Sequence, residues 1–316
     1  MESKKLIVTA SPHITNHTST RGLMLNVCIA LLPALVASTL IFGARALLVT
    51  GVTVAACVGF EALYCVVMKK PVPVGDFSAV VTGMILAFNL PATIPLWIAI
   101  IGAFVAIVVA KQLFGGLGFN FANPALLGRI VLFIGFAGRM TAYAFPQTDI
   151  DALASATPLV AGNSMAGKDM LLQLLLGAHG GVLGETCAVA LILGGIYLIA
   201  TKTISAAIPL SYIGTVAVLS LVLGQDVVLQ LFSGGLLLGA FFMATDYVTS
   251  PFTFTGRIVY GVCLGVITCI IRFYGNMAEG VSFALLLMNL LVPYIEILTR
   301  QDKLGIAKKK KEAEAK

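Results

Sequence analysis

Two short segments decide the architecture that this sequence predicts: residues 77–95, FSAVVTGMILAFNLPATIP, and residues 232–251, FSGGLLLGAFFMATDYVTSP. Each opens with Phe-Ser, continues as an apolar run and stops at a polar stretch that contains proline. A membrane-spanning helix needs about 20 apolar residues, so both runs are too short for an ordinary span. Broken helices leave backbone N–H and C=O groups without partners, and a membrane tolerates them only where protein, water or a ligand supplies those partners.

The rest of the chain is equally apolar. Hydrophobic residues make up 59% of the 316 residues and charged residues only 11%, whereas a soluble globular protein averages about a quarter charged residues. This composition excludes an ordinary cytosolic enzyme and indicates a polytopic membrane protein. Ten apolar windows are expected to be membrane helices, at about 22–42, 46–68, 76–90, 94–113, 122–138, 182–201, 206–223, 226–244, 258–274 and 280–298.

A long polar stretch divides these windows into five and five. Two five-span halves must face opposite ways, so the short third and eighth windows occupy matching positions of an inverted repeat; two accidental proline-terminated helices are the alternative. We expect an all-α polytopic membrane protein of about ten transmembrane helices, arranged as a 5+5 inverted repeat with broken helices. Its parts would be an N-terminal segment 1–21, a first repeat 22–138, an outer loop 139–181, a second repeat 182–299 and a basic tail 300–316.

The distribution of basic residues predicts the orientation. An even number of spans places both termini on one side. If that side is the cytoplasm, fifteen Lys and Arg residues, Lys111 among them, fall inside and four fall outside, which follows the positive-inside rule. The lysine-rich tail then predicts a contact with anionic membrane lipid and no nucleic-acid partner.

Cysteine and histidine are too few and too scattered for a metal centre. The six cysteines include no C-x-x-C pair, and the chain has three histidines. This spacing supports neither a disulfide framework nor a zinc site nor an iron–sulfur cluster held by this chain alone. We therefore expect no metal site, and the cysteines are predicted to be small buried apolar residues.

Three acidic residues lie within or at the ends of apolar windows: Glu61, Asp76 and Asp246. A carboxylate inside a membrane is costly and indicates an ion or proton site. The alternative is structural. Asp76 and Asp246 would then be helix-end acids exposed to cytoplasmic water, and Glu61 would extend along its helix to reach the interface.

Two further motifs could bind a ligand. In residues 115–124, GGLGFNFANP, glycines would let the backbone approach a flat ligand closely. The side chains of Asn120 and Asn123 could then read the edge of a planar heterocycle. The alternative is a glycine-rich turn with a helix starting at Asn123-Pro124. In residues 151–159, DALASATPL, small neighbours leave Thr157 accessible, although serine and threonine beside proline are also ordinary turn residues.

The second of these motifs resembles the acceptor site at which a flavin transferase attaches FMN to threonine through a phosphoester. Asp151, Ala156 and Thr157 match that pattern, while Ser155 stands where glycine is usual and Ala154 where serine or threonine is usual. Other motifs in the same order also look like the RnfD/NqrB family: residues 11–13 (SPH), 76–83 (DFSAVVTG), 89–91 (NLP), 120–129 (NFANPALLGR) and 244–251 (ATDYVTSP).

This resemblance implies a fold similar to urea channels, with FMN bound covalently to Thr157 at the outer face. It implies a second, non-covalent flavin in the membrane, which is riboflavin in relatives, and Asn120 and Asn123 match the family residues at that flavin. Asp246 matches a family aspartate that is a candidate for coupling to cation movement. Position 247 is tyrosine where many relatives have proline.

The function that the resemblance implies belongs to a complex. The chain would be the flavin-carrying subunit of a bacterial inner-membrane assembly that couples electron transfer between reduced ferredoxin and NAD⁺ to Na⁺ or H⁺ translocation, with both termini cytoplasmic and no turnover alone. Its partners would be the other Rnf subunits (RnfA, RnfB, RnfC, RnfE and RnfG), the flavin transferase and membrane lipid.

Three alternatives remain. The first is a subunit of the Na⁺-translocating NADH:quinone oxidoreductase, which typically has a long N-terminal extension that this chain lacks. A passive channel or secondary transporter would equally suit an inverted repeat but needs no acceptor threonine. A structural scaffold would bind no flavin.

Overall fold

The computed structural model describes residues 19–143, 170–177, 179–275 and 280–300. Within these ranges every regular element is helical, and the single β-bridge joins Pro91 to Val182. In chain order the elements are α1 (Thr20–Phe42), α2 (Ala44–Val67), the 3-10 helix η1 (Val74–Asp76), α3 (Ser78–Phe88), α4 (Leu96–Phe104), the π-helix η2 (Val105–Gln112), α5 (Pro124–Gly135), α6 (Ala137–Met140), α7 (Met170–Leu176), α8 (Ala188–Ala200), α9 (Ala207–Val222), α10 (Val227–Phe232), α11 (Leu236–Leu238), the π-helix η3 (Gly239–Met243), α12 (Phe254–Tyr274) and α13 (Val281–Leu298).

Each predicted apolar window contains between one and three helical elements. Four helices, α1, α2, α12 and α13, are long and apolar enough to cross a membrane, and shorter apolar helices accompany them. Large apolar side chains cover the outward faces of these helices, and Leu40, Leu221 and Leu298 are 76%, 71% and 85% exposed. So much exposed apolar surface is expected where lipid rather than water covers a protein, as in a polytopic membrane protein.

Two windows differ from the prediction. The window at 226–244 is not one helix, because Gly234 and Gly235 adopt φ values of 75° and 67° between α10 and α11. Glycine adopts this left-handed conformation at little cost, and it ends a helix. In the window at 182–201 the helix begins only at Ala188. The preceding residues pair instead with the end of α3.

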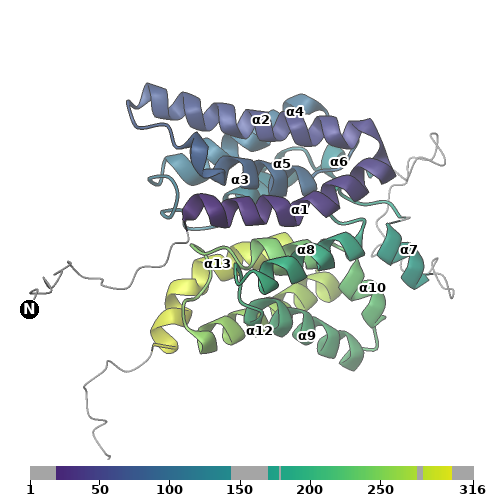
Figure 1. The fold of residues 1–316 in the computed structure, drawn as a ribbon. Coiled ribbons are helices and arrows are strands. Elements are labelled where there is room, and N and C mark those ends of the chain that lie inside the picture. Colours follow the sequence, from purple (N-terminus) through teal and green to yellow (C-terminus); the bar gives the residue numbers. More distant parts are fainter. Residues whose placement is uncertain (1–18, 144–169, 178, 276–279, 301–316) are drawn as a thin grey trace, which may run out of the picture.

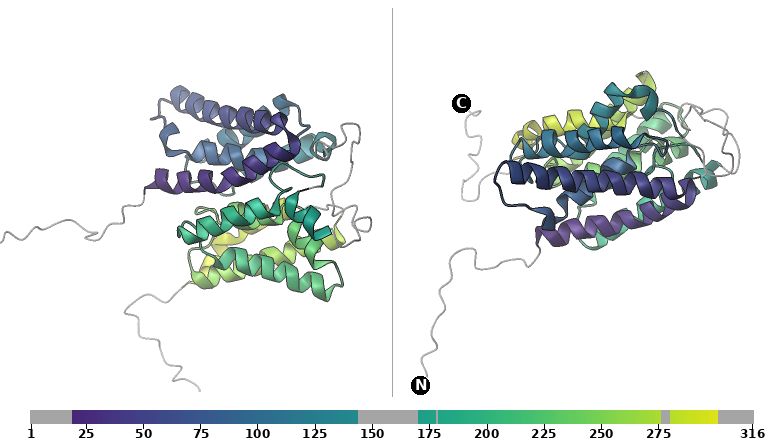
Figure 2. Two further views of the ribbon diagram at one scale, coloured as in Figure 1. Left: turned by 45° about the vertical axis from the view of Figure 1, so that its right-hand side comes forward. Right: turned by 90° about the horizontal axis from the view of Figure 1, so that it is seen from above.

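The helices form two groups that face each other (Figure 1). Helices α1 to α6 make up one group and α8 to α13 the other, and the two groups also lie apart in the left view of Figure 2. Helix α1 packs along α8 across the boundary, and α5 meets α13. Helix α1 begins and α13 ends on one side of the molecule, opposite to α6 and α7.

One extended segment closes the boundary between the groups near α7. The N–H of Leu183 donates to the carbonyl of Leu90 (3.0 Å), and the N–H of Gly184 donates to that of Phe88 (2.8 Å). The backbones approach so closely that a Cβ atom at residue 184 would lie 2.4 Å from the Cβ of Phe88. Only glycine fits there, and the broken end of α3 thereby gains backbone partners from the other group.

Candidate functional site

A cavity of about 310 Å³ lies between the two groups of helices. It lies toward the end where α1 begins, because Thr20 and Leu23 contribute to its wall. Its other walls come from α3, η2, the loop before α5, α8, η3 and the segment after η3. The polar side chains that line it are Thr20, Ser78, Thr82, Lys111, Asn120, Asn123, Thr245, Asp246 and Tyr247.

The two asparagines enter this cavity from the glycine-rich loop that the sequence singles out. Asn123 caps α5, because its Oδ1 accepts from the N–H groups of Ala125 (3.1 Å) and Leu126 (3.4 Å). A helix therefore starts at Asn123-Pro124, as the alternative interpretation of this motif expects. Asn120 is buried, and its amide donates to the carbonyl of Ala122 (3.0 Å). Both side chains thus have structural bonds and also face the cavity.

The loop owes its course to its glycines. Gly115, Gly116 and Gly118 have φ values of 124°, 98° and 93°, a region that side-chain-bearing residues rarely enter. The chain can therefore turn back sharply after η2 and carry Asn120 to the cavity.

Asp246 lies on the opposite wall, between η3 and α12. Its carboxylate accepts from the N–H of Val248 (3.4 Å) and the hydroxyl of Thr249 (3.3 Å), and Asn120 lines the same cavity. Burial raises the pKa of the Asp246 carboxyl, and these hydrogen bonds oppose the shift. Asp246 is therefore not a fully water-exposed helix-end acid.

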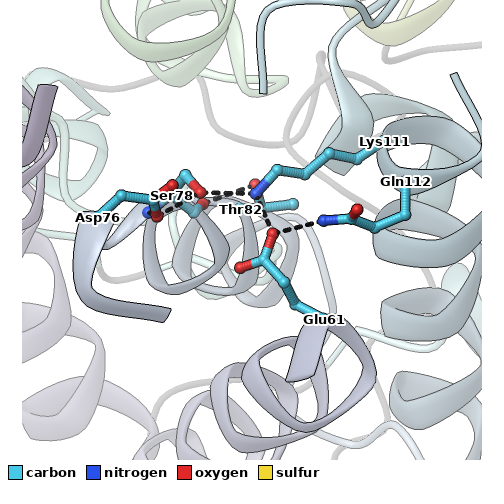
Figure 3. Close-up of polar contacts among 6 residues, drawn as sticks. All are labelled: Glu61, Asp76, Ser78, Thr82, Lys111 and Gln112. Carbon is cyan, nitrogen blue, oxygen red and sulfur yellow. Dashed lines mark hydrogen bonds and ion pairs between the residues drawn. The ribbon is translucent and has the colours of Figure 1, made fainter. Parts of the chain in front are cut away.

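A buried ion pair lies beside α3, and one of its members, Lys111, lines the cavity (Figure 3). The ammonium of Lys111 donates to Oε1 of Glu61 and to Oγ of Ser78, at 2.6 Å each, and Nε2 of Gln112 donates to the same Glu61 oxygen at 2.8 Å. The side chains of Lys111 and Glu61 are 3% and 0% exposed. Oε2 of Glu61 is buried without a hydrogen-bond partner.

This ion pair corrects two expectations. Glu61 does not extend to the interface, because Lys111 from the fourth window compensates its charge inside the protein. Lys111, one of the basic residues expected on the cytoplasmic side, is buried and is not a free charge at the membrane surface. The sequence does contain a usable signal here, since a lysine and a glutamate that lie in different apolar windows are expected to pair.

Asp76 is a helix-end residue with a structural role, which was the alternative to an ion or proton site. Its Oδ1 accepts from the N–H (2.8 Å) and the hydroxyl (2.6 Å) of Ser78 at the start of α3. Phe77 between them has a left-handed φ of 63°. Asp76 therefore stabilises the first turn of α3, where a negative charge is favourable, and does not line the cavity.

Sequence reasoning missed a second polar cluster, at the break before α11. The guanidinium of Arg272 donates to the carbonyls of Gln230 (2.6 Å), Ser233 (3.1 Å) and Gly234 (3.2 Å). Glu185 accepts from the N–H of Gly234. These two residues supply the backbone partners that a broken helix needs.

Arg129 extends this polar region to the other group of helices. It is buried in α5, and its Nη1 donates to Oδ1 of Asn89 (2.7 Å) at the end of α3. Arg129 thus holds the side chain of Asn89, whose amide donates to the carbonyl of Ile85 in α3. In the other group, Arg272 bonds directly to the backbone.

Four predicted site residues, Asp151, Ser155, Ala156 and Thr157, lie outside the described residues. Within the described part of the chain, no group of three or more His, Cys, Asp and Glu side chains is placed to hold a metal ion. All six cysteines there are free.

Comparison with known proteins places this architecture in a family. The model of the NQR2, RnfD, RnfE family matches residues 7–305. The chain belongs to this family. A family member in Acetobacterium woodii, the D subunit of a Na⁺-translocating ferredoxin:NAD⁺ oxidoreductase complex, is 46% identical over 100% of both chains.

Two further members of the NQR2, RnfD, RnfE family are similar along most of their length. The D subunit of the proton-translocating ferredoxin:NAD⁺ oxidoreductase complex of Clostridium ljungdahlii is 39% identical over 94% of this chain and 96% of its own. The D subunit of the ion-translocating oxidoreductase complex of Stutzerimonas stutzeri is 38% identical over 91% of this chain and 93% of its own.

Proposed function

We propose that this chain is the RnfD subunit of a membrane complex that couples electron transfer between reduced ferredoxin and NAD⁺ to ion translocation. The observation that carries the proposal is the similarity over the full length to the equivalent subunit of such a complex, at 46% identity. The chain would act only within the complex, with the other Rnf subunits as partners.

The translocated ion is left open between Na⁺ and H⁺. The Acetobacterium woodii relative is named for Na⁺ and the Clostridium ljungdahlii relative for protons, although the similarity to each extends over nearly all of this chain. Asp246 is the proposed coupling group because its carboxylate is partly buried on the wall of the cavity. A carboxylate in this setting can bind either cation.

The cavity is the proposed site of a non-covalent flavin. Its volume of about 310 Å³ lies at the lower end of the range for small-molecule sites. Val81, Ile85, Leu117 and Phe242 give it apolar surface, and the amides of Asn120 and Asn123 add polar groups at one side. A planar ring with a polar edge suits this arrangement. A bound flavin would supply the one- and two-electron chemistry, while the protein positions it.

A second flavin, FMN, is proposed on Thr157, attached by a flavin transferase through a phosphoester. Support comes from the match of Asp151, Ala156 and Thr157 to the acceptor pattern. Residues 144–169 connect α6 to α7, which lie at the opposite end of the molecule from the start of α1, where the cavity begins. The two flavins would therefore serve opposite membrane faces.

We also infer a ten-span inverted repeat in the bacterial inner membrane, with both termini cytoplasmic. The packing supports it, since α2 packs along α4 and η2 as α9 packs along α12. Both half-helices begin after a left-handed residue, Phe77 before α3 and Gly235 before α11. In each half a basic residue of the fourth span, Lys111 or Arg272, contacts the residues at that start.

The test uses the complex purified through an affinity tag on this chain and reconstituted into lipid vesicles. We expect partner subunits to copurify. We also expect reduced ferredoxin with NAD⁺ to drive uptake of sodium or protons. An ionophore for one ion, added while uptake of the other is measured, distinguishes the two cases. A tagged chain that purifies alone and lets a solute pass without any redox substrate would contradict the proposal and favour a passive channel.

A further inference from the structure

The buried side chain of Lys111 forms part of the cavity wall. Lys111 lines the cavity together with Ser78 and Thr82, whereas its partner Glu61 is not among the lining residues. The positive member of the pair therefore lines the cavity and the negative member does not; Figure 3 shows the contacts between them.

A short network of hydrogen bonds holds this arrangement. Lys111 donates to Glu61 and to Ser78, Ser78 donates in turn to Asp76, and Gln112 donates to Glu61. Burial of the two charges costs more than an exposed ion pair would, since both lose their hydration. Two well-packed apolar side chains would fill the same space without that cost. The pair therefore requires an explanation beyond stability.

An ion pair in this position interacts electrostatically with any charge on a molecule bound in the cavity. Adding electrons to a bound ring adds negative charge. The protein charge that faces the ring from this wall is positive, and its effect is strong because little water screens it. Reduction is then easier than in water, which means a higher midpoint potential. Charge close to a flavin ring is one of the means by which proteins tune its potential.

We propose that Lys111 raises the midpoint potential of the flavin in the cavity and that Glu61 moderates this effect. The inference rests on the proposed function, because it takes the non-covalent flavin as the occupant. Lys111 and Glu61 are thus positioning and tuning residues for a cofactor that receives electrons derived from reduced ferredoxin and passes them on toward NAD⁺.

The experiment is a redox titration of the acid-extractable flavin in the whole purified complex. Asn120→Leu, which removes a polar group of the same cavity, identifies the signal that belongs to this site. Glu61→Gln keeps a hydrogen-bonding oxygen beside Lys111 but removes the negative charge. The double variant Lys111→Met/Glu61→Gln removes both charges and avoids an unpaired buried carboxylate. Lys70→Met is the matched control, since Lys70 is exposed and lies outside this cavity.

The proposal predicts opposite shifts. Glu61→Gln is expected to raise the midpoint potential above that of the wild type, the double variant to lower it below the wild type, and Lys70→Met to leave it unchanged. Shifts of the same sign, no shift, or loss of the flavin from both variants would overturn the tuning role. Absence of extractable flavin from the wild-type complex would instead overturn the flavin site itself, so the two failures are distinguishable.

Discussion

Asn120 and Asp246 both line the cavity that lies between the two groups of helices. One comes from the loop before α5 and the other from the segment after η3, so both halves of the chain contribute to the cavity. A residue proposed to bind flavin thereby shares a cavity with a residue proposed to bind an ion. Coupling between electron transfer and ion movement needs a physical connection of this kind between its two sites.

The covalent flavin is tested at Thr157. Thr157→Ala is expected to abolish flavin fluorescence of the denatured chain without reducing its amount in the membrane, because only one hydroxyl is removed. In-gel fluorescence and peptide mass analysis across residues 140–168 measure this. Ser155→Ala, which removes a neighbouring hydroxyl, is the control and should retain the flavin. Flavin fluorescence in the denatured Thr157→Ala chain would show that the flavin is attached to another residue.

The two asparagines are expected to behave differently. Asn123→Ala removes the cap of α5 and should destabilise the protein by about 1 kcal/mol, in addition to weakening flavin binding. Asn120→Leu leaves that cap intact and should lose extractable flavin with a smaller change in Tm. Flavin content and thermal unfolding of the purified complex separate the two effects. Full flavin content in both variants would place the flavin outside this cavity.

Asp246→Asn is expected to keep both flavins but to weaken ion uptake relative to ferredoxin-dependent NAD⁺ reduction, because the amide cannot carry the charge. The measurement is the ratio of ions taken up to NAD⁺ reduced in vesicles. Since burial raises the pKa of Asp246, wild-type coupling should fail on acidification at a pH above about 3.9, the pKa of an ordinary aspartate. An unchanged ratio in the variant would show that Asp246 has only a structural role, in the turn that it forms with Val248 and Thr249.

The closure between the two groups of helices is tested with a pair of glycines. Gly184→Ala would place a Cβ 2.4 Å from that of Phe88, whereas the nearest atom to a Cβ at Gly181 is at 3.5 Å. Overpacking of this kind costs on the order of 1–3 kcal/mol. Gly184→Ala should therefore lower the Tm and the yield of the detergent-purified complex, and Gly181→Ala should change them little. Equal stability of the two variants would show that the segment can move aside.

Composition and hydropathy by themselves determined the helical class and the position of the apolar windows, because a chain this poor in charge can bury its backbone polar groups in lipid only as helices. Features that involve only neighbouring residues could also be predicted from the sequence. Asn123 before Pro124 caps a helix because both residues act within one turn. The start of a half-helix at Phe77-Ser78 likewise depends only on residues next to each other in the chain.

The tertiary structure alone decided which of these features meet. Sequence reasoning did not match Glu61 to Lys111, nor Arg272 to the break at Gly234, because each contact joins helices far apart in the chain. The same holds for the cavity, since Asp246 approaches Asn120 and Lys111 only when the two groups of helices pack together. Sequence periodicity reports which face of a helix is apolar, but the neighbour that covers that face depends on long-range packing, and in this protein that packing assembles the site.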